Sequence, residues 1–249
     1  MHEKENGAAT SKIGNQLQTN PLFIVGEILL MFTAILALMK LTLPLAGENP
    51  LFKQFIAGLA NVLMLVYIWV GLKLRGETWK DFGLTFKPIS LKEGLKTFLI
   101  SLLVSALGAA GFIVGSIIMV NITDIPENAD MSGYNYLKNN LGMLFLALGS
   151  VYIVSSFAEE VIYRAFLINR ITAIGQKKKN AIYVAVMLSS FIFGLIHYEW
   201  GPMGMVQTGF MGLAMGICYI TFKKRLWILI LAHGYLDTIL LVQLYLADK

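Results

Sequence analysis

The stretch LGMLFLALGSVYIVSSFAEEVIYRAFLI, residues 141–168, decides the fold class, because it is a long apolar run that carries charged residues in its second half. A helix needs about 20 predominantly apolar residues to cross the hydrocarbon core of a membrane. This run has that length, yet it contains Glu159, Glu160 and Arg164. Ionisable side chains are costly inside a membrane and usually serve a function there. The run therefore predicts a transmembrane helix with a polar site.

The composition of the whole chain agrees with a membrane protein. Hydrophobic residues make up 57% of the sequence and charged residues only 14%, whereas a soluble domain has about 25% charged residues. Six further apolar runs cover about residues 22–45, 55–72, 95–122, 181–196, 205–222 and 226–246. Only helices and closed barrels satisfy the backbone in lipid, and these runs are too long and continuous for barrel strands. We expect an all-α fold, a polytopic transmembrane helical bundle of about seven spans.

The chain divides into two parts. Residues 1–20 are polar and predict a disordered cytoplasmic tail, and residues 21–249 predict a single membrane-embedded helical domain that carries its functional motifs within residues 141–246. The net charge of +5 indicates loops that face anionic lipid. No basic stripe interleaved with aromatic residues indicates nucleic-acid binding.

Lys and Arg residues in the expected loops predict the orientation. Basic residues are frequent in residues 73–96, in the loop expected to begin at Arg170, and in residues 223–225. These loops alternate with residues 124–140 and 199–204, which are poor in Lys and Arg. Because cytoplasmic loops carry the excess of Lys and Arg, we expect a multi-pass protein of the cell membrane with a cytoplasmic N-terminus.

Polar side chains recur inside three of the late runs. The fourth run holds Glu159, Glu160 and Arg164, the fifth ends in His197, and the seventh holds His233 and Asp237. Only three histidines occur in the chain, and two of them belong to this set. This concentration of ionisable groups is the strongest functional signal in the sequence.

The spacing of these residues predicts how they pair. Residues four apart share a face of a helix, so Glu160 is expected to pair with Arg164. Glu159 lies about 100° around the same helix and remains free for chemistry. By the same spacing Asp237 can hold the ring of His233 in one tautomer, and Phe193 shares a face with His197.

A free carboxylate and two imidazoles could together activate a water and stabilise an oxyanion. Three other interpretations remain open: the groups pair across helices for purely structural reasons, they hold a metal ion, or a histidine activates one of the serines. The candidate serines are Ser155, Ser156, Ser189 and Ser190. No HExxH motif is present, which argues against a zinc protease of that type. An aspartyl protease needs two aspartates within its spans, and only Asp237 lies in one. We expect no cofactor, and a metal is not favoured.

Three short patterns resemble those of a known family. Residues 159–164 match EExxxR, residues 193–197 match FxxxH, and residues 233–237 match HxxxN/D. Their order and their placement on three late hydrophobic runs resemble the CAAX protease and bacteriocin-processing family, which includes the type II CAAX prenyl endopeptidases. The resemblance covers about Met143 to Leu246.

The resemblance implies an intramembrane, glutamate-dependent endopeptidase. By motif position Glu159 would be the general base, and His197 would help to activate the water. His233 would face the oxyanion, with Asp237 beside it. The supporting residues would be Glu160, Arg164 and Phe193.

Asp237 departs from the family pattern, because many members have Asn at this position. An ionised carboxylate cannot donate a hydrogen bond to an oxyanion. A second difficulty is depth, because the expected topology puts His197 near the outer end of its helix and His233 nearer the inner end. A strong tilt or a broken helix could bring them together.

We therefore predict a membrane-embedded endopeptidase that cleaves peptides or membrane-associated proteins, with a peptide or protein substrate and membrane lipid as its partners. One alternative is a non-proteolytic binding or bacteriocin-immunity protein on the same scaffold. A transporter with a proton-relay carboxylate is a second alternative. It would require counterparts of these motifs in the first half of the chain, and the sequence has none.

Overall fold

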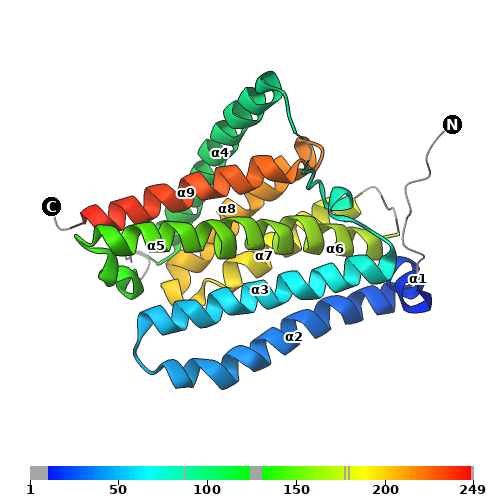
Figure 1. Ribbon diagram of the computed structural model, residues 1–249, viewed down its shortest axis with the longest axis horizontal. Helices are drawn as coiled ribbons and strands as arrows, with labels where there is room; N and C mark the ends of the chain where they lie inside the picture. The colour runs from blue at the N-terminus through cyan, green and yellow to red at the C-terminus, as the bar shows by residue number, and fades with distance from the viewer. Residues whose placement is uncertain (1–10, 87, 124–130, 177, 179, 248–249) are drawn as a thin grey trace.

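The computed structural model describes residues 11–86, 88–123, 131–176, 178 and 180–247. Within these ranges all regular structure is helical, which confirms the predicted all-α fold. The elements are α1 (Lys12–Thr19), α2 (Pro21–Ala46), α3 (Pro50–Arg75), η1 (Trp79–Phe82), α4 (Leu91–Thr123), η2 (Ser132–Leu137), α5 (Leu141–Val151), η3 (Tyr152–Phe157), η4 (Glu160–Ile168), α6 (Asn169–Ile174), α7 (Ala181–Leu195), η5 (Tyr198–Trp200), α8 (Gly201–Thr221) and α9 (Leu226–Leu246). Figure 1 shows α2 and α3 as an antiparallel pair beside α5 and α6, with α9 on their other side and α4 crossing the bundle obliquely.

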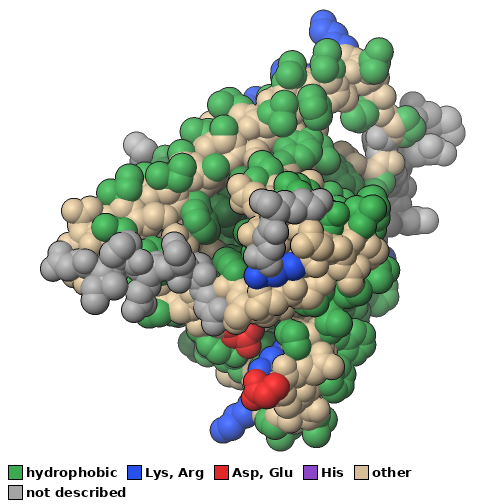
Figure 2. Space-filling view, turned by 90° about the vertical axis from the view of Figure 1, so that its left-hand side faces the viewer, with side chains coloured by type: hydrophobic (Ala, Val, Ile, Leu, Met, Phe, Trp, Pro, Cys, Tyr) green, Lys and Arg blue, Asp and Glu red, His purple; other side chains and the backbone are tan. Residues whose placement is uncertain are grey.

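In the part of the chain that the structure describes, six helical segments are long and apolar enough to cross a membrane, and α7 is a shorter apolar helix of 15 residues. Many large apolar side chains point outward, among them Leu36, Leu41 and Leu45 of α2. Figure 2 looks onto the end of the bundle where α9 finishes, and hydrophobic side chains are spread over much of the visible surface, with few charged ones among them. Such a surface suits lipid contact, so the protein is a multi-pass membrane protein, and the prediction of about seven spans is confirmed.

The two ends of the bundle differ in charge. Helices α3, α6 and α8 finish at one end, which we call the basic end because residues 222–225 and the last turn of α3 carry Lys and Arg. The turn between α2 and α3, the short helix η2 and the end of α9 lie at the opposite end, which we call the far end (Figure 1). Asn49 caps α3 at the far end, and Gly76 ends it at the basic end with a left-handed backbone.

Small residues let α4 and α8 approach each other closely. A Cβ atom at Gly111 of α4 would lie 2.6 Å from the backbone oxygen of Phe210 on α8. Glycine is therefore required for the two backbones to approach this closely, as in other membrane helix pairs.

Two expectations need correction, one about the N-terminal segment and one about where the fourth helix ends. Helix α1 lies within the segment that was expected to be a disordered tail, and its residues Gly14 and Leu17 are buried against the rest of the chain. The backbone N–H and the hydroxyl of Ser11 both donate to the Leu74 carbonyl of α3. Residues 1–10 of the expected tail lie outside the described residues.

The second correction concerns Arg170, which was assigned to a loop. The fourth helix continues through η4 and α6 as far as Ile174. Arg170 is buried within it, because its Nε donates to Glu27 of α2 over 2.8 Å. The basic loop therefore begins after this helix.

Candidate active site

The long fourth helix changes its winding where it carries the first motif. Two π-helical stretches, η3 and η4, interrupt the α-helix, and Glu159 lies at the join between them. The wider π turn is rare and is frequent at functional sites. The side chains of Glu159 and Glu160 therefore point in different directions from those that a regular α-helix would give them.

Glu160 contacts both an imidazole and a guanidinium group at the centre of the cluster. Its Oε1 accepts a hydrogen bond from His233 Nδ1 over 2.8 Å and lies 3.1 Å from Arg164 Nη1. The predicted pairing of Glu160 with Arg164 is confirmed. Glu160 is fully buried, so the pair lies away from solvent. Breaking one partner of such a pair leaves an uncompensated charge.

Glu159 is placed differently from its neighbour. Its Oε2 lies 4.0 Å from His233 Nε2 and forms no hydrogen bond with any residue that the structure describes. The side chain is buried all the same. Buried polar atoms normally have hydrogen-bond partners, so this oxygen is available to a further group such as a reacting water.

Asp237 lies near the same nitrogen of the His233 ring as Glu159 does. Its Oδ1 is 3.7 Å from His233 Nε2, and its Oδ2 accepts a hydrogen bond from Ser156 Oγ over 2.7 Å. Asp237 therefore lies near the ring as expected, while the hydrogen bond that holds the ring is the one from Nδ1 to Glu160. Sequence reasoning considered Ser156 only as a nucleophile. The structure instead makes it the donor that orients Asp237.

His197 joins the cluster through Phe193. Its Nδ1 lies 2.8 Å from the Phe193 carbonyl oxygen, which can only accept, so Nδ1 carries the proton and Nε2 is left with a lone pair. The ring packs between Phe193 and Trp200, with centroid distances of 4.8 Å to each. Phe193 also contacts the His233 ring, at a centroid distance of 6.3 Å. Trp200 was missed from sequence, although it follows His197 by three residues.

Phe193 and Gly212 close the back of the cluster. The Arg164 guanidinium lies 4.3 Å from the centre of the Phe193 ring, a cation–π contact. A Cβ atom at Gly212 of α8 would lie 2.9 Å from Phe193 Cδ1. Glycine at this position lets α8 pack directly against the aromatic ring.

The short length of α7 explains how His197 and His233 can lie at similar depths in the membrane. Its 15 residues span about 22 Å, whereas the hydrocarbon core is about 30 Å thick. His197 follows directly after this short helix and therefore need not reach the membrane surface. His233 lies two turns into α9, and the two rings flank Phe193.

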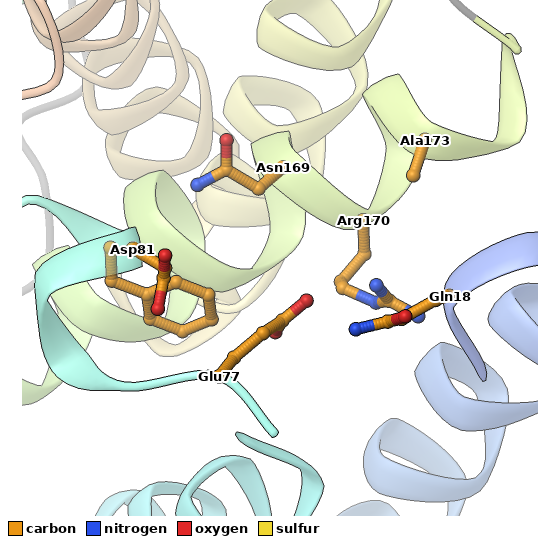
Figure 3. A pocket seen from close by; sticks show the side chains of 7 residues that line it. Gln18, Glu77, Asp81, Asn169, Arg170 and Ala173 are labelled. Atoms are coloured by element: carbon orange, nitrogen blue, oxygen red, sulfur yellow. The ribbon is translucent and has the colours of Figure 1, made fainter. Parts of the chain in front are cut away.

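A second buried polar cluster lies at the basic end, away from these motifs. Glu27 of α2 accepts hydrogen bonds from Arg75 and Arg170, and Arg75 also donates to Glu77 over 2.6 Å. No pattern in the sequence predicted these partners. A cavity of about 240 Å³ borders the cluster (Figure 3) and contains no motif residue in its wall. Its lining residues are Gln18, Glu77, Asp81, Phe82, Asn169, Arg170 and Ala173.

Fold and site together define a class: an all-α, multi-pass membrane protein with carboxylates and imidazoles gathered inside the bundle. Residues 141–239 match the family model described as "Type II CAAX prenyl endopeptidase Rce1-like". This match confirms the resemblance to the CAAX protease and bacteriocin-processing family, and it covers all three motifs. No curated protein and no solved structure matches the chain. The protein is thus a multi-pass membrane protein whose residues 141–239 are similar to a family of CAAX proteases.

Proposed function

We propose that the protein is an intramembrane endopeptidase in which Glu159 activates a water to cleave peptides or membrane-associated proteins. The observation that carries this proposal is the position of Glu159 Oε2, which is buried without a hydrogen-bond partner among the described residues and lies 4.0 Å from His233 Nε2. The match of residues 141–239 to a protease family supports the same chemistry.

In the proposed reaction Glu159 acts as general base and then as general acid. Its carboxylate takes a proton from the water, and the resulting hydroxide attacks the carbonyl carbon of the scissile peptide bond. When the C–N bond breaks, the proton passes from Glu159 to the leaving amine. The products are a carboxylate and an amine, and no cofactor takes part in these steps.

The two histidines take different roles because their hydrogen bonds differ. The lone pair on His197 Nε2 can hold the attacking water as acceptor, since Nδ1 is committed to the Phe193 carbonyl. His233 is held by Glu160 through Nδ1, and its Nε2 faces the side where Glu159 and Asp237 lie. With a proton on Nε2, His233 donates to the oxyanion of the tetrahedral intermediate.

We further propose that the protein lies in the cell membrane with a cytoplasmic N-terminus. The basic end carries the Lys and Arg of residues 222–225 and the end of α3, and such residues favour the cytoplasmic side. The proposal covers peptide bonds of membrane-associated substrates and does not require a prenyl group.

The test is cleavage of a fluorogenic peptide panel by the purified, lipid-reconstituted protein, with prenylated and unprenylated members. Glu159→Gln keeps the shape of the side chain and removes the base, so we expect kcat/KM to fall by about 100- to 10,000-fold. Glu48→Gln in the exposed turn before α3 is the matched control and should retain activity.

Each other outcome changes the proposal. Cleavage by Glu159→Gln at the wild-type rate would refute the role of Glu159. Loss of activity with a chelator, restored by added metal, would make the same residues ligands. If the wild type cleaves no peptide, the binding or immunity function becomes the better explanation, and Asp237 in place of Asn would agree with it.

A further inference from the structure

Two polar side chains of neighbouring helices bind the backbone of the fourth helix within its π-helical stretches. Asn61 of α3 donates from Nδ2 to the carbonyl oxygen of Val154 over 2.7 Å. Ser189 of α7 donates from Oγ to the carbonyl oxygen of Tyr163 over 2.7 Å. Val154 belongs to η3 and Tyr163 to η4, about one turn before and one turn after Glu159. The two hydrogen bonds therefore lie on either side of the proposed base.

The π winding changes which donors the carbonyls of this helix receive. In a regular α-helix the N–H of Ala158 donates to Val154, four residues earlier. Here it donates to the carbonyls of Ile153 and Ser155. Within a membrane no water replaces a donor that a carbonyl has lost, and side chains of neighbouring helices supply it. Asn61 gives Val154 such a donor.

Packing holds both contacts in place. On α3, a Cβ atom at Gly58, one turn before the asparagine, would lie 3.4 Å from the Val154 side chain. On α7, Ser189 is buried, and Phe193, one turn further along the same face, meets the Tyr163 ring at a centroid distance of 5.1 Å. The fourth helix is thus fixed by α3 before the first motif and by α7 within it.

The bond from Ser189 to another helix differs from the usual behaviour of a helical serine. Serine hydroxyls in helices commonly bond to a carbonyl three or four residues earlier in the same helix. The next residue, Ser190, does so, and it donates to the Val186 carbonyl over 2.7 Å. Asn61 lies in the middle of an apolar span, where a polar side chain is costly unless it is paired. Both donors are paired with the backbone of the π-helical stretches.

We propose that Asn61 and Ser189 are positioning residues, which hold the π winding of the fourth helix and thereby the direction of the Glu159 carboxylate. A π turn contains more residues than an α turn, so it advances each residue by a smaller angle. Loss of either π stretch would therefore rotate Glu159 about the helix axis, away from its place 4.0 Å from His233 Nε2. This inference rests on the proposed endopeptidase function.

Asn61→Leu and Ser189→Ala test the inference in the same reconstituted cleavage assay. Each variant removes a donor and keeps most of the side-chain volume. We expect kcat to fall by about 10- to 100-fold for each, because a displacement of about 1 Å in a catalytic geometry can cost about 100-fold. KM should change by less than about twofold, since the loss falls on the transition state.

Matched controls separate positioning from the loss of a hydrogen bond between helices in general. Gln207 Nε2 of α8 donates to Ser116 Oγ of α4 over 2.8 Å, and this bond does not involve the fourth helix. Gln207→Leu is the control for Asn61→Leu, and Ser116→Ala is the control for Ser189→Ala. Both controls should keep the wild-type kcat. Thermal unfolding of all four variants shows whether the two pairs lose similar stability.

The outcomes distinguish this inference from the proposed function. If the wild type cleaves and both test variants keep its kcat, or lose no more than their controls, the positioning role is refuted while the proposed function stands. Loss of cleavage in Ser189→Ala with normal cleavage by Asn61→Leu would also refute it, because that pattern fits a serine nucleophile. A wild type without any cleavage would overturn both the inference and the proposed function.

Discussion

Replacing Glu27 with leucine tests the buried charge cluster at the basic end. The side chain of Glu27 is 3% exposed, and both of its carboxylate oxygens are bound. Oε1 accepts from Arg75, and Oε2 accepts from Arg170 Nε over 2.8 Å. Glu27→Leu removes the only acidic group of α2 and leaves the apolar surface of that helix unbroken.

The remaining contacts of the two arginines set the size of the effect. Removing one partner of a buried ion pair costs about 3–5 kcal/mol. Arg75 keeps its bond to Glu77 at 2.6 Å, and Arg170 keeps its bond to the Leu17 carbonyl of α1. Since neither guanidinium loses every acceptor, the two losses do not add in full. We expect the free energy of unfolding to fall by about 3–5 kcal/mol in total.

Equilibrium unfolding in detergent micelles measures this change. Glu48→Leu, in the exposed turn between α2 and α3, is the matched control and should unfold like the wild type. Arg170→Leu and the double variant complete a cycle. The double variant should lose less stability than the sum of the two single variants, because residues that contact each other are coupled.

Two results would refute this reasoning. One is a Glu27→Leu protein as stable as the control. The other is a double variant whose loss equals the sum of the single losses, since that would mean that Glu27 and Arg170 contribute independently.

Two further predictions concern the site. Gly212→Leu forces a side chain against Phe193, so we expect a loss of about 1–3 kcal/mol in stability together with lost cleavage. Gly149→Leu, with nothing within 4 Å of its added Cβ, should show neither change in the same unfolding and cleavage measurements. Ser156→Ala removes the donor to Asp237 Oδ2, which should cost about 1–3 kcal/mol. An unchanged unfolding midpoint for Ser156→Ala would show that this hydrogen bond does not hold Asp237.

The spans were predictable from sequence because a helix that lies in lipid requires a long apolar run. Such a run can be recognised without knowing how the helices pack. Helix α1 was not, since its eight residues form a short helix whose stability comes from packing. Its contacts, from Ser11 to Leu74 and from Gln18 Nε2 to the Arg75 carbonyl, join segments far apart in the chain. Arg170 was misplaced for the same reason, because its partner Glu27 is 143 residues away.

The members of the candidate site were also predictable, but their pairing was only partly so. Spacing along one helix predicted the contact between Glu160 and Arg164, since both lie on the same element. The hydrogen bond from His233 to Glu160 crosses between helices, and no local pattern encodes it. The π turns around Glu159 change the direction of its side chain in a way that a regular helix does not predict.

The two buried polar clusters differ in a way that bears on function. At Glu27 both carboxylate oxygens are bound by guanidinium groups, so the effect of this carboxylate is on stability. At the motif residues Glu159 Oε2 has no hydrogen-bond partner among the described side chains, although it is buried beside an imidazole. A buried carboxylate without a partner raises the free energy of the fold. This carboxylate lies within the segment that matches a protease family, and in the proposed reaction it is the base that takes a proton from water.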